Sequence, residues 1–285
     1  MYHYGLLTIS VIMFGFQFYF NDMYKKENGS DSVSAFVLTF ISGVAGVISL
    51  LLINGFSREA TPFTLIISSV SACNSILYSF CSLKALARIN LSLYSLFAML
   101  GGMVLPFFQG IIFYNEDITV AKILCMIFVI LALGLTVEKG EKRGGTLYYA
   151  GVFVLNGMSG VLSKIFKESA YDKTSDAMYS IWIAMFAVLI SGIVLLCMLK
   201  KLKLPNFKAL LYGVGYGSIT RVANYLLLIA LAVLPASVQY PFITGGVMIV
   251  STVFSVIMGQ KPSKKEVLSV ALSFVGILLL VFIPI

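Results

Sequence analysis

Long apolar runs alternate with short polar breaks along the whole chain. Most runs hold roughly 20 mainly apolar residues, the length that a helix needs to cross a hydrocarbon core about 30 Å thick. They are continuously apolar and lack the alternation of a barrel strand, so the pattern predicts an all-α polytopic membrane protein. Ten transmembrane helices are expected, at residues 4–21, 33–53, 62–83, 91–113, 119–137, 147–166, 178–199, 207–230, 236–258 and 265–282.

The second half of the chain echoes the first. Gly101-Gly102 falls opposite Gly245-Gly246 at an offset of 144, and the same offset places "NEDIT" from Asn115 opposite "GQKPS" from Gly259. Self-similarity at a fixed spacing indicates a duplicated unit, so we expect two five-helix repeats, at residues 1–140 and 141–285. Because five is odd, the second repeat enters the membrane in the opposite sense, which gives the inverted arrangement typical of secondary transporters.

Composition excludes several classes of protein. Of the 285 residues, 59% are hydrophobic and 11% are charged, whereas a soluble domain has about 25% charged residues. The four cysteines lie in apolar stretches and form no C-x-x-C pair, and the single histidine is His3. No Walker-type phosphate loop is present, and no embedded cluster of His and acidic residues suggests catalysis. We therefore expect no metal, no cofactor and no enzyme activity.

Basic residues collect in the connections after odd-numbered spans. The rule that Lys and Arg favour cytoplasmic loops then puts both termini outside the cytoplasm of an inner-membrane protein. Because these residues are scattered over short loops, the net charge of +8 does not indicate nucleic-acid binding. Fourteen lie on that side (Lys25, Lys26, Lys84, Arg88, Lys139, Lys142, Arg143, Lys200, Lys201, Lys203, Lys208, Lys261, Lys264 and Lys265) against five on the other (Arg58, Lys122, Lys164, Lys167 and Lys173).

One segment carries a resemblance to a known family. "ALAVLPASVQYPFITGGVMIVSTVFSVIMGQKPS", from Ala230, resembles the EamA-type pattern of the drug/metabolite transporter superfamily, as do the ten-span layout and the repeat. Gln260 stands where the family usually has Glu, and Asn115 replaces the usual Gly before Glu116. The resemblance implies a small-molecule transporter, and it usually implies cytoplasmic termini, against the loop charges.

Arg221 is the clearest candidate for a functional residue. It lies well inside the eighth expected span, where a charge costs a few kcal/mol on insertion scales. Helical spacing places Ser218, Asn224 and Tyr225 on its face, and its guanidinium offers a fixed fork of donors for carboxylate or phosphate. One interpretation is that Arg221 binds an anionic group of the substrate in a central cavity. The other is that it pairs with backbone carbonyls or extends to an interface.

Weaker candidates lie in equivalent helices. Asn74 and Tyr78, four residues apart in the third span, either face the same cavity or bond to neighbouring helices, and packing is somewhat favoured for Asn74. Gln17 and Asn156 lie in the middle of the first and sixth spans, and Tyr94 and Tyr240 lie near the starts of the fourth and ninth spans, at a possible gate or rim.

Other charged residues have plainer interpretations. Glu116 and Asp117 lie at the end of a span, where we expect a solvated loop, and Lys164 near the end of the sixth span is expected to reach the interface.

We therefore predict a secondary transporter that moves a small polar metabolite, such as an amino acid or related carboxylate-bearing compound, by export or exchange through alternating access. The alternative is a flippase for a lipid-linked sugar or phospholipid, in which Arg221 meets a phosphate. The expected partners are a small-molecule substrate and the lipid bilayer, with the chain a monomer or a homodimer.

Overall fold

The computed structural model describes residues 2–29, 31–55, 59–86, 91–135, 146–201, 204–257 and 263–282. Within these ranges the chain is helical and contains no strand, as the apolar pattern predicts. Ten α-helices and one short 3₁₀-helix, η1 (Leu199–Lys201), make up the fold. The α-helices are α1 (Tyr2–Asn28), α2 (Ser32–Asn54), α3 (Pro62–Leu86), α4 (Leu91–Tyr114), α5 (Val120–Leu135), α6 (Thr146–Glu168), α7 (Asp176–Cys197), α8 (Phe207–Ala230), α9 (Ala236–Ile257) and α10 (Lys264–Phe282).

Several helices begin at a polar capping residue. The side chain of Asp31 accepts a hydrogen bond from the Ser34 amide at the start of α2, and Asn206 accepts one from Ala209 at the start of α8. Such a cap satisfies one of the backbone donors that the first turn leaves unpaired. At the end of α2, Gly55 takes a φ of 72°, a conformation that suits glycine. Capping residues in the short connections therefore define where these helices begin and end.

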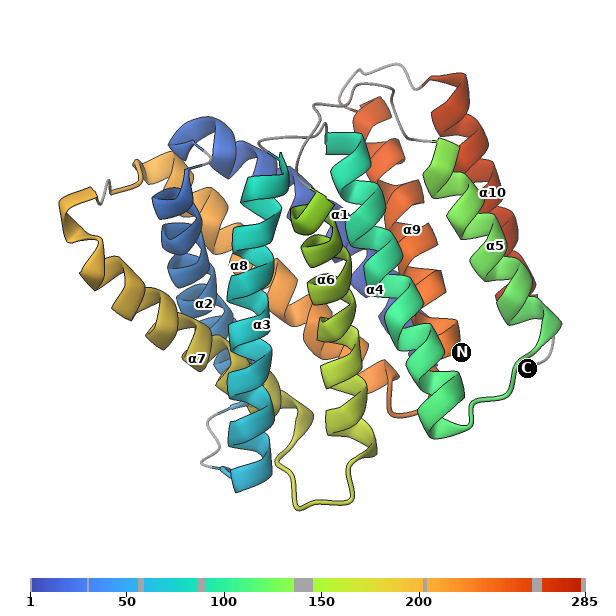
Figure 1. Cartoon of the computed structure of the whole chain (residues 1–285), viewed down its shortest axis with the longest axis horizontal. Coiled ribbons are helices and arrows are strands. Elements are labelled where there is room, and N and C mark those ends of the chain that lie inside the picture. Colours follow the sequence, from blue (N-terminus) through green and yellow to red (C-terminus); the bar gives the residue numbers. More distant parts are fainter. Residues whose placement is uncertain are drawn as a thin grey trace.

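Eight of the helices form a closed ring. Following the contacts, α1 packs on α8, α8 on α2, α2 on α7, α7 on α3, α3 on α6, α6 on α4, α4 on α9, and α9 again on α1. The pair α5 and α10 packs against α9 outside this ring, at the right of Figure 1. Every principal pair in the ring has a counterpart five helices further along, such as α1 with α8 and α3 with α6.

The start of α1 and the end of α10 lie on one face of the molecule, toward the lower right of Figure 1. We call this the terminal face, and it also carries the connections α2–α3, α4–α5, α6–α7 and α8–α9. The boundary expected between residues 140 and 141 lies outside the described residues.

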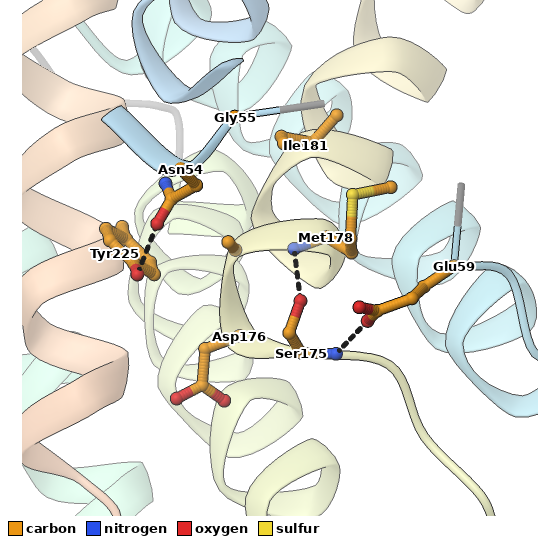
Figure 2. A pocket seen from close by; sticks show the side chains of 9 residues that line it. Asn54, Gly55, Glu59, Ser175, Asp176, Met178, Ile181 and Tyr225 are labelled. Atoms are coloured by element: carbon orange, nitrogen blue, oxygen red, sulfur yellow. Dashed lines mark hydrogen bonds between the residues drawn. The ribbon is translucent and has the colours of Figure 1, made fainter. Parts of the chain in front are cut away.

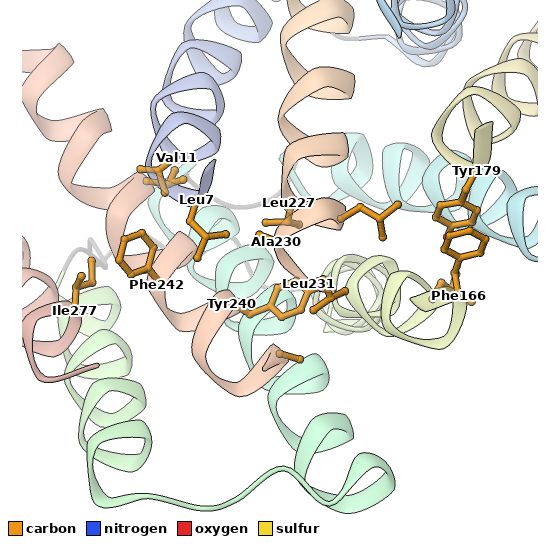
Figure 3. Packing of buried hydrophobic residues seen from close by; sticks show 14 of the residues in the cluster. Leu7, Val11, Phe166, Tyr179, Leu227, Ala230, Leu231, Tyr240, Phe242 and Ile277 are labelled. Carbon is orange, nitrogen blue, oxygen red and sulfur yellow. The ribbon is translucent and has the colours of Figure 1, made fainter. Parts of the chain in front are cut away.

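A buried apolar cluster crosses the ring near the terminal face. Phe166 of α6 and Tyr179 of α7 stack with ring centroids 3.9 Å apart. Leu227 of α8, Leu231 just after it and Tyr240 of α9 belong to the same buried cluster, which Figure 3 shows. Leu7 of α1 and Ile67 of α3 also belong to it, so helices from both halves of the chain meet at this end of the ring.

Six helices are long and apolar enough to cross a membrane by length and composition: α1, α2, α3, α4, α6 and α7. Three shorter apolar helical stretches, within α5, α9 and α10, add to them among the described residues. Ten helices are thus present where ten spans are expected, but six of them satisfy the stricter criterion and α8 belongs to neither group.

Glycines bring two pairs of helices into close contact. A Cβ on Gly101 of α4 would collide with the carbonyl oxygen of Phe153 in α6, and one on Gly217 of α8 would collide with the backbone of Ser42 in α2. Small residues let helix backbones approach where lipid offers no other driving force.

We predict that Gly101→Ala destabilises the protein by about 1–3 kcal/mol, the usual cost of overpacking. The added methyl group meets backbone rather than a flexible side chain, so α4 and α6 have to separate. Thermal unfolding of the purified protein in detergent measures the effect. Gly134→Ala is the matched control, because nothing lies within 4 Å of a Cβ at that helical position. Equal melting temperatures for the two variants would contradict the prediction.

Candidate functional site

Arg221 lies where α8 crosses α2. Its aliphatic stem packs on Gly46 of α2, at a point where any Cβ on residue 46 would overlap the arginine Cγ. Within the described part of the chain, its guanidinium makes no hydrogen bond and no ion pair, and its electrostatic neighbour is Tyr216. An embedded arginine normally pairs with carbonyls or acids. Arg221 therefore retains hydrogen-bond donors that the surrounding protein does not use.

Unpaired acceptors lie close by on the paired helices. Gln17 Oε1 of α1 and Thr220 Oγ1 of α8 are buried without a hydrogen-bond partner in the described structure. Ser10 Oγ donates to Ala223 O at 3.2 Å, and Phe20 packs on Gly215, so Gln17 lies between two direct contacts of α1 with α8. A buried unpaired polar atom costs about 1–3 kcal/mol. Unmet donors and acceptors on this stretch are what a polar ligand would satisfy.

Tyr225 lies one turn further along α8, in a different environment. Its hydroxyl donates to Asn54 Oδ1 at 2.6 Å. Both residues line a cavity of about 370 Å³ at the terminal face, together with Glu59, Ser175 and Asp176 (Figure 2). The carboxylate of Glu59 accepts the Ser175 amide at 2.9 Å. This cavity is bordered by carboxylates, so its electrostatics differ from those around Arg221.

Three other predicted residues bond to backbone carbonyls of neighbouring helices. Asn74 donates to Leu155 O at 2.9 Å, Asn156 donates to Ala98 O at 2.6 Å, and the Tyr240 hydroxyl donates to Gly160 O at 3.2 Å. These bonds join α3 to α6, α6 to α4, and α9 to α6. The polar groups of these side chains are thus engaged in helix packing.

The remaining predicted residues are dispersed. Asn224 is exposed and donates to Thr220 O at 2.8 Å within α8. Ser218 is partly buried, and Tyr78 packs against a small cluster formed by α3, α4 and α6. The side chain of Tyr94 lies outside the described residues. The structure therefore brings Arg221 and Gln17 to one pair of helices but does not gather all ten candidates.

Thr220 and Tyr216 join this region without having been predicted. Thr220 directly precedes Arg221 in α8 and Tyr216 lies five residues before it, but neither residue type stands out in an apolar span. The signal that identifies Thr220 is its unpaired oxygen, which only the packed structure reveals.

Glu116 corrects an expectation, because it is not part of a solvated loop. Its side chain is 8% exposed and accepts hydrogen bonds at the start of α9, from the Ala236 amide at 2.9 Å, the Ser237 amide at 2.9 Å and the Ser237 hydroxyl at 2.6 Å. Lys164, near the same end of the ring, is buried and not solvated. Its ammonium lies 3.0 Å from Glu116 and 2.9 Å from Glu168. A carboxylate is stabilised at the positive N-terminal end of a helix dipole. Glu116 therefore caps the N-terminus of α9 and, through Lys164, links it to α6.

The pKa of Glu116 reflects these contacts. Burial alone raises it, but the hydrogen bonds from Ser237, Ala236 and Lys164 outweigh burial and hold the pKa below its ordinary value of 4.5. Glu116 is therefore ionised at neutral pH. Among the described residues, no group of three or more His, Cys, Asp or Glu side chains is placed to hold a metal ion.

We predict that Glu116→Gln lowers the free energy of unfolding by about 1–3 kcal/mol at pH 7, because Lys164 and the first turn of α9 lose a charged partner. A lowered carboxyl pKa gives stability that is present above the ordinary pKa and is lost as the pH falls through the folded value. The wild-type melting temperature should therefore fall more steeply below pH 4.5 than that of the variant. The control is Asp117→Asn, at an exposed neighbouring position. Parallel pH profiles for wild type and Glu116→Gln would rule this role out.

Comparison with known proteins supplies a family. No curated protein matches the chain. A solved crystal structure superposes with a TM-score of 0.74 at 16% sequence identity, covering 97% of this chain and 95% of the other, which demonstrates a shared fold. Residues 144–282, which comprise α6 to α10, match the EamA-like transporter family. This half of the chain is similar to the EamA-like transporter family, part of the drug/metabolite transporter superfamily, and this match together with the apolar helices indicates a multi-pass membrane protein.

Proposed function

We propose that this protein is a secondary transporter of a small polar metabolite that carries a carboxylate, such as an amino acid or a related compound. In this proposal the substrate crosses the inner membrane by export or exchange, through the centre of the eight-helix ring. The observation that carries the proposal is Arg221, an embedded arginine without a hydrogen-bond partner in the described structure.

The chemistry around Arg221 favours a carboxylate with further polar groups. A guanidinium binds a carboxylate through two parallel hydrogen bonds. Gln17 and Thr220 on the same pair of helices then offer acceptors for an ammonium or hydroxyl group of the same molecule. An arginine and unpaired acceptors together suit a zwitterion better than a purely anionic compound.

The mechanism we propose is alternating access between two inverted repeats. Support comes from the ring itself, in which the pairs α1–α8, α2–α8 and α1–α9 correspond to α6–α3, α7–α3 and α6–α4. An inverted repeat places a substrate site between two units that rock against each other. The apolar cluster around Phe166 and Tyr179 would then form the closed gate on the terminal face.

The orientation we propose follows the basic loops. Five lysines lie at helix ends opposite the terminal face. They are Lys25 and Lys26 at the end of α1, Lys200 and Lys201 in η1, and Lys208 at the start of α8. The terminal face would then lie outside the cytoplasm, and its closed cluster would seal the outer side.

We predict that Arg221→Gln reduces transport at least about tenfold, because a charge-assisted hydrogen bond contributes about 1.5–3 kcal/mol. Arg221→Lys should recover part of that loss, since a lysine keeps the charge but not the planar fork. Uptake and exchange of labelled amino acids by proteoliposomes measure the effect. Lys208→Gln, which removes one charge from the exposed start of α8, serves as the control.

Normal transport by both Arg221 variants would overturn the proposed site. If no water-soluble compound were transported while fluorescent phospholipids or lipid-linked sugars were translocated, a flippase function would replace the proposal. Both measurements use the same purified protein.

For the orientation, we predict that a cysteine at Lys173 reacts with a membrane-impermeant maleimide applied to intact cells, whereas a cysteine at Lys142 does not. Lys173 is exposed in the α6–α7 connection of the terminal face. The native Cys73, Cys81, Cys125 and Cys197 are first replaced, since two of them are exposed. Labelling at position 142 and protection at position 173 would reverse the proposed orientation.

A further inference from the structure

An apolar groove lies between α4 and α6, away from Arg221. Its volume is about 420 Å³, within the range of small-molecule sites. Phe108, Ile112 and Phe113 of α4 line it together with Met158 and Ile165 of α6. Phe108, Ile112 and Phe113 are 46%, 64% and 75% exposed, so this side of the helices points away from the protein. In a multi-pass membrane protein such a groove opens toward the acyl chains of the bilayer.

The length of the groove corresponds to one leaflet. Its lining on α4 runs from Leu105 to Tyr114. Nine helical steps of about 1.5 Å span roughly 14 Å, close to half of a hydrocarbon core about 30 Å thick. The groove therefore begins near the middle of the membrane and ends at the terminal face.

Protein contacts hold the groove open. Gln109, which is 7% exposed, donates from Nε2 to Val161 O at 3.3 Å and tethers the two helices. Pro106 packs against Gly160 at the same interface. Gln109 Oε1 is buried without a hydrogen-bond partner among the described residues, and the other side chains that line the groove are apolar apart from Tyr114.

Charged residues lie at the interfacial end. The Lys164 ammonium is 5.3 Å from the centre of the Tyr114 ring and contacts both Glu116 and Glu168. Lys122 donates to the backbone of Asp117 nearby, at 2.6 Å. Lys173 donates to the carbonyl oxygens of Lys167 and Ser169, on either side of Glu168, so three ammonium groups face the three carboxylates of Glu116, Asp117 and Glu168. The carboxylate of Glu168 is 41% exposed, and a headgroup ammonium is attracted to it.

We propose that this groove binds one acyl chain of a phospholipid from the terminal-face leaflet, with an ammonium-bearing headgroup beside Tyr114 and Glu168. The acyl chain covers the exposed aromatic and aliphatic side chains of α4. The headgroup ammonium contacts the carboxylate of Glu168, at the point where α6 meets the Glu116 network. This lipid site is separate from the proposed transport pathway and does not depend on the substrate.

Native mass spectrometry of the whole protein tests the proposal, with phosphatidylethanolamine and phosphatidylglycerol of identical acyl chains as probes. We expect phosphatidylethanolamine to be retained preferentially, by about threefold or more. Met158→Trp, which fills the groove, should abolish this preferential retention. Leu131→Trp, at an exposed position on α5, should leave it unchanged.

One further variant separates the headgroup from the acyl chain. Glu168→Gln should remove the preference for phosphatidylethanolamine while retention of both lipids continues. Unchanged retention in Met158→Trp would overturn the site, and equal retention of the two lipids by the wild type would overturn the headgroup assignment.

Discussion

The fold depends on one constraint, which is that polar groups within the hydrocarbon must find partners inside the protein. Helices satisfy the backbone, and polar side chains then bond to carbonyls of neighbouring helices, as Asn74, Asn156 and Tyr240 do. Each of these bonds joins two helices of the ring. Against this background, the unused donors of Arg221 are conspicuous. The same constraint that holds the ring together thus explains why Arg221 carries the proposed function.

Glu116 illustrates the same need for polar partners inside the protein, at the edge of the membrane. It lies between α4 and α5, yet its hydrogen-bond partners are the first residues of α9 and the ammonium of Lys164 in α6. One carboxylate therefore replaces the missing helical partners of α9 and neutralises a lysine that is only 4% exposed. The contact joins the first half of the chain to the second, next to the apolar cluster on the terminal face. Any movement of α9 relative to α6 has to include this network.

Sequence reasoning predicted the helical architecture well because its signals are local. Each signal concerns a residue and its immediate surroundings, as with an apolar run, the helix cap at Asp31 and the close helix contact at Gly101. The role of Glu116 was missed because Ser237 lies 121 residues away, and a carboxylate beside a span normally indicates a solvated loop. Arg221 could be predicted as a candidate because a charge stands out in an apolar run, whereas Thr220 is recognisable only by its unpaired oxygen.

In the proposed mechanism, the apolar cluster on the terminal face constrains how a substrate can drive transport. Opening it would separate the Phe166–Tyr179 stack and expose the leucines of α8, which costs free energy in proportion to the apolar area uncovered. A ligand shifts such an equilibrium only by its difference in affinity between the two states. Binding at Arg221 therefore promotes opening only if its contacts improve as α8 moves. Because Arg221 and Leu228 lie on the same helix two turns apart, a displacement of α8 that optimises the guanidinium contact also displaces a wall of the apolar cluster.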